Sequence, residues 1–144
     1  MGVEIKENFT IEIHGFSATA INRDYAGTAF KLSDRMWQAV KTNGLKHKGK
    51  NIWVYEDKDL VFAGVELEDE PPAQIGLERK NIDLKKYAYY KHVGAYEQIK
   101  YAGQRMSAEL NSKGYKIVQP YIEIYGHWTN DVTKLETELF MCLG

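Results

Sequence analysis

The sequence contains an internal repeat, and this feature constrains the fold more than any other. Residues 34–55 align without a gap on residues 104–125, an offset of 70 residues. The aligned pairs include Met36 with Met106, Gly44 with Gly114, and Tyr55 with Tyr125. Two copies are too few for a solenoid, so they predict two equivalent units that pair about a pseudo-twofold axis. Coincidence is the alternative explanation, because few of the aligned positions are identical.

Each copy predicts the element order strand, helix, strand, strand. Short first strands are expected at residues 17–22 and 86–91. The second strands, residues 51–55 and 121–125, alternate side chains at a period of two, as strands do. The closing strands are expected at residues 60–67 and 135–143.

The helices are predicted by apolar residues that recur at intervals of three and four, which places them on one helical face. These residues are Ala29, Leu32, Met36 and Val40 in the first copy, and Ile99, Ala102, Met106 and Leu110 in the second. Gly44 and Gly114 follow directly, where a left-handed C-terminal cap favours glycine.

These elements predict a single α+β domain spanning residues 1–144. It would consist of duplicated β-α-β-β units with pseudo-twofold symmetry, antiparallel sheets, two main helices and a ligand cleft between the halves. Repeat one is expected at about residues 10–67 and repeat two at about residues 84–144. Residues 68–83 would form a linker, since they begin with an acidic, proline-containing run. A chain of 144 residues is long enough to bury a conventional core.

Alternation along the second strands assigns their side chains to two faces. One face carries Ile52, Val54, Ile122 and Ile124, which we expect to lie under the two helices. The other carries Asn51, Trp53, Tyr55, Tyr121, Glu123 and Tyr125. An exposed face of this kind would be an apolar patch that invites association, so we expect it to line a cleft. The chain is also rich in aromatic residues, with ten Tyr, five Phe and three Trp.

Glu123 is the leading candidate for a binding residue. A carboxylate between Tyr121 and Tyr125 is costly to bury alone, and burial would raise its pKa. A cationic ligand would compensate the charge, and the aromatic faces would add cation–π attraction. The alternative is that Glu123 pairs with a nearby lysine or arginine on a half-exposed strand.

Composition excludes several other classes of function. The formal net charge is −1, with 19 basic and 20 acidic side chains, which does not favour direct binding to nucleic acid. The first ten residues are charged and do not resemble a signal peptide, and no apolar run approaches membrane-spanning length. Cys142 is the only cysteine. A cytoplasmic protein is therefore expected.

No cofactor or metal is predicted from the motifs. The four histidines, His14, His47, His92 and His127, are scattered without metal-ligand spacing. Neither a nucleotide-binding glycine loop nor a nucleophile elbow occurs. The basic residues 46–50 are expected to be a solvated loop, with a phosphate contact as the alternative.

Three segments resemble the gyrase-inhibitor-like (GyrI-like) small-molecule-binding family, which includes the effector-binding domains of AraC- and MerR-type multidrug regulators. Residues 86–96 resemble the strand and turn that open its second half. Residues 120–125 resemble its Phe-Glu-Ile-Tyr strand, and residues 137–143 its closing strand. The chain departs from the family at Cys142, where proline is usual. Trp53 occupies the position equivalent to Glu123 in the first copy, so the site would be asymmetric.

The resemblance implies a cleft with Glu123 at its base, contacting the positive part of lipophilic drugs or dyes. It also implies a stand-alone binding module, since no residues are left for a DNA-binding domain. We expect Trp53, Tyr121, Tyr125, Tyr89 and Tyr96 to form the stacking walls. Trp128 would act as a lid over the cleft or cover the rim of the core. Glu138 would lie near the cleft or in a structural hydrogen-bond network.

The leading hypothesis is thus a non-catalytic binder that senses or sequesters amphipathic, cationic compounds. A second is a hydrolase of reactive cyclopropane-type compounds, with Glu123 as general base. A third, implied by the family name alone, is an inhibitor of a protein partner such as gyrase. The sequence does not determine the oligomeric state.

Overall fold

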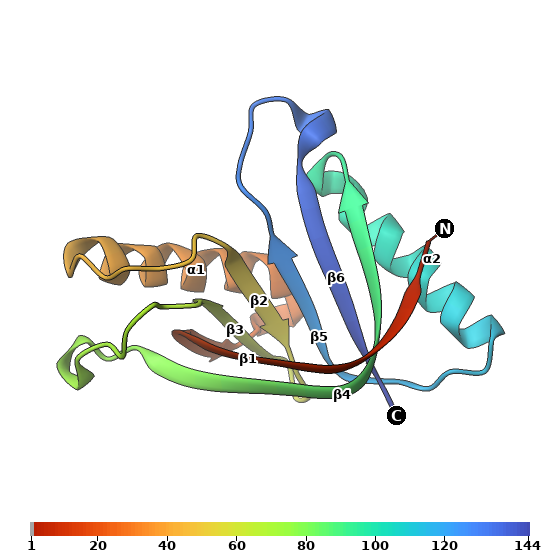
Figure 1. Cartoon of the computed structure of the whole chain (residues 1–144), viewed down its shortest axis with the longest axis horizontal. Coiled ribbons are helices and arrows are strands. Elements are labelled where there is room, and N and C mark those ends of the chain that lie inside the picture. The colour runs from red at the N-terminus through yellow and green to blue at the C-terminus, as the bar shows by residue number, and fades with distance from the viewer. Residues whose placement is uncertain (1) are drawn as a thin grey trace.

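The computed structural model describes residues 2–144, which form two long helices and six strands (Figure 1). The elements are β1 (Glu4–Thr19), α1 (Tyr25–Thr42), β2 (Asn51–Tyr55), β3 (Leu60–Val65), β4 (Glu78–Val93), α2 (Ile99–Ser112), β5 (Ile117–Tyr125) and β6 (Glu136–Leu143). The order β-α-β-β occurs twice, which confirms the predicted α+β fold with duplicated units. In the described part of the chain, no helix is both long and apolar enough to cross a bilayer.

The first strand of each unit is much longer than predicted. The prediction placed these strands at residues 17–22 and 86–91, whereas β1 and β4 have 16 residues each. The physical reason is that β1 and β4 pair with each other, from Glu4 opposite Tyr89 to Gly15 opposite Glu78. As a result β4 begins inside the segment predicted to be a linker.

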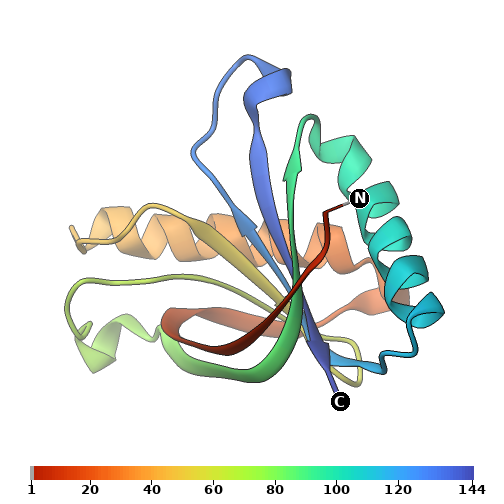
Figure 2. The ribbon, with the colours of Figure 1, turned by 45° about the vertical axis from the view of Figure 1, so that its right-hand side comes forward.

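The six strands form a closed antiparallel barrel in the order β1-β3-β2-β5-β6-β4. The two units join where β2 pairs with β5, and there Trp53 lies opposite Glu123. These two residues occupy equivalent positions in the two copies, so the pseudo-twofold axis passes through this pair. Figures 1 and 2 show α1 and α2 on the outside of the strands, with α1 behind β2 and β3 and α2 beside β4 and β6.

The helices do not pack on the predicted strand face. Ile52, Val54, Ile122 and Ile124 point into the barrel, where they form a core with residues of other strands such as Ile13. The residues under α1 are Phe16, Val61, Ala63 and Val65, and those under α2 are Ala88, Leu139, Met141 and Leu143. The prediction was wrong because it assumed a single core, whereas a barrel must fill its interior as well as cover its outer face.

The helices themselves agree with the sequence. All eight residues of the predicted apolar stripes are buried. Gly44 and Gly114 follow the C-caps with φ values of 59° and 81°, the left-handed conformation that glycine adopts without a Cβ clash. Asp24 caps α1 by accepting a hydrogen bond from the Gly27 backbone N–H at 3.1 Å.

Candidate functional site

A large cleft lies on the outer face of β2 and β5, between the N-terminal ends of the two helices. Its volume is about 1520 Å³. It is lined by side chains of β2 and β5, of the start of α1, of the turn Tyr96–Gln98 with the first residues of α2, and of the segment after β5. This is the cleft between the halves that the repeat predicted.

The strand face that the sequence assigned to the cleft forms its floor. Trp53 and Glu123 lie at the centre, and each is flanked by residues of its own strand. The flanking residues are Asn51 and Tyr55 on β2, and Tyr121 and Tyr125 on β5. The antiparallel register places Tyr55 opposite Tyr121 and Asn51 opposite Tyr125. The backbone of the floor is thus pseudo-symmetric, whereas its side chains differ, since one carboxylate lies opposite one indole.

Glu123 is buried, with 8% of its surface exposed. One carboxylate oxygen accepts a hydrogen bond from the Tyr121 hydroxyl at 2.8 Å, and the other accepts one from the Tyr125 hydroxyl at 2.5 Å. Desolvation raises the pKa of Glu123, and the two tyrosine hydrogen bonds lower it by a smaller amount. Burial also raises the pKa of both tyrosines, so they stay protonated and continue to donate.

Glu123 has no counter-ion among the described residues. Among residues 2–144, no lysine, arginine or histidine nitrogen lies within 4.0 Å of its carboxylate. The alternative that Glu123 pairs with a nearby basic side chain is therefore wrong. The two hydrogen bonds offset only part of the cost of burying an ionised group, so the carboxylate is poised to accept a positive charge.

Aromatic rings form the rest of the floor and two of its sides. Tyr55 and Tyr121 stack with centroids 5.8 Å apart, and Trp53 meets Tyr125 edge to face at 4.7 Å. At the start of α1, Tyr25 contacts Tyr55, while Tyr96 contacts Tyr125 just before α2. The two units thus contribute equivalent tyrosine pairs on opposite sides of Glu123. Such surfaces bind apolar rings and also attract cations.

Two further polar atoms of the floor have no internal partner. The indole N–H of Trp53 and the side-chain oxygen of Asn51 are buried, and neither makes a hydrogen bond within the described chain. Buried polar atoms are usually satisfied. Two residues that line the floor thus each keep a buried polar atom without a hydrogen-bond partner in the described chain.

The charged residues around the cleft are predominantly acidic. The acidic lining residues besides Glu123 are Asp24, Asp34, Glu56, Asp57 and Asp59, and the basic ones are Arg23, Lys58 and Lys100. An excess of negative charge around a partly desolvated cleft lowers the local energy of cations and raises their local concentration.

The structure places six of the eight predicted site residues in the cleft. They are Glu123, Trp53, Tyr121, Tyr125, Tyr96 and Trp128. Trp128 is 73% exposed, so it lies at the rim and does not cover the core. Tyr89 and Glu138 lie elsewhere. The Tyr89 hydroxyl donates to Glu138 at 2.7 Å and Lys50 pairs with Glu138 at 3.5 Å, which is the structural network considered as the alternative.

The prediction missed contributions from the first helix. Tyr25 and Phe30 of α1 line the cleft. Tyr55 stacks on Tyr121, whereas the prediction placed Tyr55 on the cleft face without counting it among the stacking walls. The repeat carried a signal for Tyr25, since it precedes the first helical stripe much as Tyr96 precedes the second. Phe30 had no such signal, because it lies off the buried stripe.

The fold is similar to those of several solved structures. The C-terminal domain of EcmrR superposes with a TM-score of 0.78 at 16% identity, covering 99% of this chain and 97% of that domain. SAV2435, solved bound to tetraphenylphosphonium, gives a TM-score of 0.70 at 18% identity, covering 100% of this chain and 94% of that one. A hydrolase from Listeria innocua gives 0.61 at 9% identity, with coverages of 99% and 91%.

These likenesses concern the fold. They show that the chain shares its fold with these proteins, which agrees with the fold implied by the GyrI-like resemblance of the three sequence segments. No protein-family model matches the sequence, and the search of curated proteins also found no match.

Proposed function

We propose that this protein binds amphipathic, cationic small molecules in the cleft on β2 and β5, and so senses or sequesters them. The observation that carries the proposal is Glu123, a buried carboxylate that has two tyrosine donors and no basic partner in the described chain. A ligand that brings a positive charge to this carboxylate offsets part of the cost of keeping it ionised.

The surroundings of Glu123 favour a cation that also has apolar rings. Tyr55, Tyr121, Tyr125 and Trp53 provide aromatic faces on both sides of the carboxylate. Each face that contacts the cation contributes about 0.5–2 kcal/mol. In support, SAV2435, which shares this fold, was solved with tetraphenylphosphonium, a cation surrounded by four phenyl rings.

Broad specificity follows from this arrangement. Stacking and a single charge place few directional demands on a ligand. The cleft volume of about 1520 Å³ exceeds the roughly 300–1,000 Å³ of typical small-molecule pockets, so analogues of different shape can be accommodated.

The direct test compares two ligands of similar size and different charge. Methyltriphenylphosphonium and triphenylphosphine oxide each carry three phenyl rings, but only the first is a cation. We expect saturable binding of the phosphonium, measured by quenching of tryptophan fluorescence, with at least about tenfold higher affinity than the oxide. Equal affinities would contradict the role given to the charge.

The same carboxylate supports a second candidate function, hydrolysis of a strained electrophile. Burial raises the pKa of Glu123, and a carboxylate of raised pKa is suited to take a proton from an attacking water. A hydrolase shares this fold at 9% identity. The test is turnover of a cyclopropane-containing electrophile by wild type and by Glu123→Ala. Equal rates in the two proteins would eliminate this candidate.

A further inference from the structure

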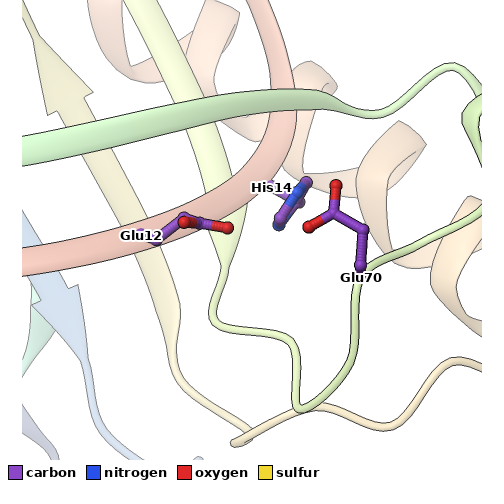
Figure 3. A group of neighbouring side chains, drawn as sticks. All are labelled: Glu12, His14 and Glu70. Atoms are coloured by element: carbon purple, nitrogen blue, oxygen red, sulfur yellow. The ribbon is translucent and has the colours of Figure 1, made fainter.

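Three side chains that do not line the cleft come together beside the middle of β1. Glu12 and His14 lie two residues apart on the same face of β1, and Glu70 comes from the connection between β3 and β4. One ligand atom of each lies within 4.8 Å of the other two. Figure 3 shows both carboxylates pointing toward the imidazole ring, one from each side.

His14 supplies the independent sign that something is bound here. It is only 4% exposed, yet neither ring nitrogen makes a hydrogen bond within residues 2–144. A buried imidazole ordinarily has a partner for at least one nitrogen, because leaving both unpaired costs free energy. The side chain is held in place by β1, which pairs with Val65 of β3 on one side and with Arg79 of β4 on the other.

The spacing leaves room for an ion between the three side chains. Among the ion pairs of the described residues none joins a His14 nitrogen to either carboxylate within 4.0 Å, so the three groups do not satisfy one another directly. Because the three ligand atoms lie within 4.8 Å of one another, some point lies within about 2.8 Å of all three. Metal–nitrogen and metal–oxygen bonds of about 2.0–2.2 Å would need each side chain to move by less than 1 Å.

We propose that Glu12, His14 and Glu70 form a binding site for a divalent transition-metal ion such as Zn²⁺. One imidazole nitrogen and two carboxylate oxygens suit Zn²⁺, Mn²⁺ or Fe²⁺ better than Ca²⁺ or Mg²⁺, which prefer oxygen ligands alone. Three protein ligands leave at least one coordination position for water. Two carboxylates and a neutral imidazole balance the charge of the ion.

The structural consequence is a cross-link between two segments. The ion would tie the acidic connection after β3 to the middle of β1, where β1 passes from its pairing with β4 to its pairing with β3. None of the three ligands lines the cleft, so the site is separate from the proposed ligand-binding function. The one basic side chain directly across from His14 is Arg79, which is exposed and makes no ion pair with Glu12 or Glu70 in the described chain.

The test uses full-length protein freed of metal by chelation and dialysis, titrated with zinc chloride by calorimetry. We expect binding of one ion per chain and a rise in Tm that the chelator reverses. Glu70→Gln, a change on an exposed segment that leaves folding intact, should weaken zinc binding by at least about tenfold. Glu68→Gln, a neighbouring exposed glutamate outside the cluster, is the matched control and should bind zinc as wild type does.

Three outcomes would overturn the proposal. They are no saturable zinc binding by wild type, equal binding by Glu70→Gln, and equal losses in Glu70→Gln and Glu68→Gln, since the last would mean attraction to the acidic segment as a whole. His14→Gln provides a second measurement, because loss of the imidazole ligand should weaken Co²⁺ binding and change the d–d absorption of the bound Co²⁺. If His14→Gln does not fold, the comparison of Glu70→Gln with Glu68→Gln decides the test.

Discussion

Replacing Glu123 by glutamine should separate the contribution of charge from that of shape. Glutamine has nearly the same volume, and its amide group can keep hydrogen bonds with Tyr121 and Tyr125. What is lost is the negative charge at the centre of the aromatic floor. The apolar contacts of the ligand with Tyr55 and Trp53 remain.

The size of the loss follows from the geometry. Two opposite charges about 4 Å apart attract by about 4 kcal/mol at the effective dielectric constant of about 20 that suits protein sites. Part of this is spent in ionising a carboxylate whose pKa is raised by burial. We therefore expect a net loss of about 2–3 kcal/mol, which corresponds to roughly 30- to 150-fold weaker binding of methyltriphenylphosphonium.

The assay is fluorescence titration of wild type, Glu123→Gln and the control Glu138→Gln with both triphenyl ligands. Glu138 is a suitable control because it too accepts a tyrosine hydroxyl, at 2.7 Å, but lies outside the cleft. We expect Glu123→Gln to lose affinity for the phosphonium and to retain it for triphenylphosphine oxide, with Glu138→Gln like wild type. A phosphonium affinity within about threefold of wild type in Glu123→Gln would refute the electrostatic reasoning.

Three more predictions follow from the same structure. Only the ionised form of Glu123 attracts a cation, so phosphonium binding by wild type should weaken as pH falls through the raised pKa of Glu123. Tyr125→Phe removes a hydrogen bond that lowers this pKa, so the pH at which binding is half lost should move upward. In the absence of ligand, the folded-state pKa of Glu123 lies above its unfolded value, so its contribution to stability is fully present below the unfolded pKa of about 4.3 and is lost as pH rises through the folded-state pKa. Glu123→Gln should therefore raise Tm at pH 7 and change it less at pH 4. A lowered Tm at pH 7 would contradict this reasoning. Gly15→Ala should lower the free energy of unfolding measured in urea, because the new Cβ would lie 1.9 Å from the Ala63 carbonyl oxygen. Gly103→Ala in α2, whose Cβ meets no atom within 4 Å, should instead raise it by about 0.5–1 kcal/mol. Similar effects of the two changes would argue against the close approach of β1 and β3.

The element order and the composition of the cleft floor could be read from the sequence because both depend on local periodicity. The helical stripes through Met36 and Met106 were predicted correctly, since one face of a helix repeats every three to four residues whatever it packs against. Alternation along β2 and β5 likewise put Trp53 and Glu123 on one face. The repeat then indicated that the two strands meet between the halves.

What each strand face contacts depends on tertiary structure, because local sequence patterns do not encode the pairing of distant strands. Pairing between β1 and β4 closes the barrel, and this long-range contact turned Ile52 and Ile122 toward an interior core instead of the helices. In the folded chain Tyr89 and Glu138 lie outside the cleft. Glu70 lies beside Glu12 and His14, although it follows His14 by 56 residues in the sequence. Periodicity determines which side of an element a residue occupies, but only the packing of distant elements determines what that side faces.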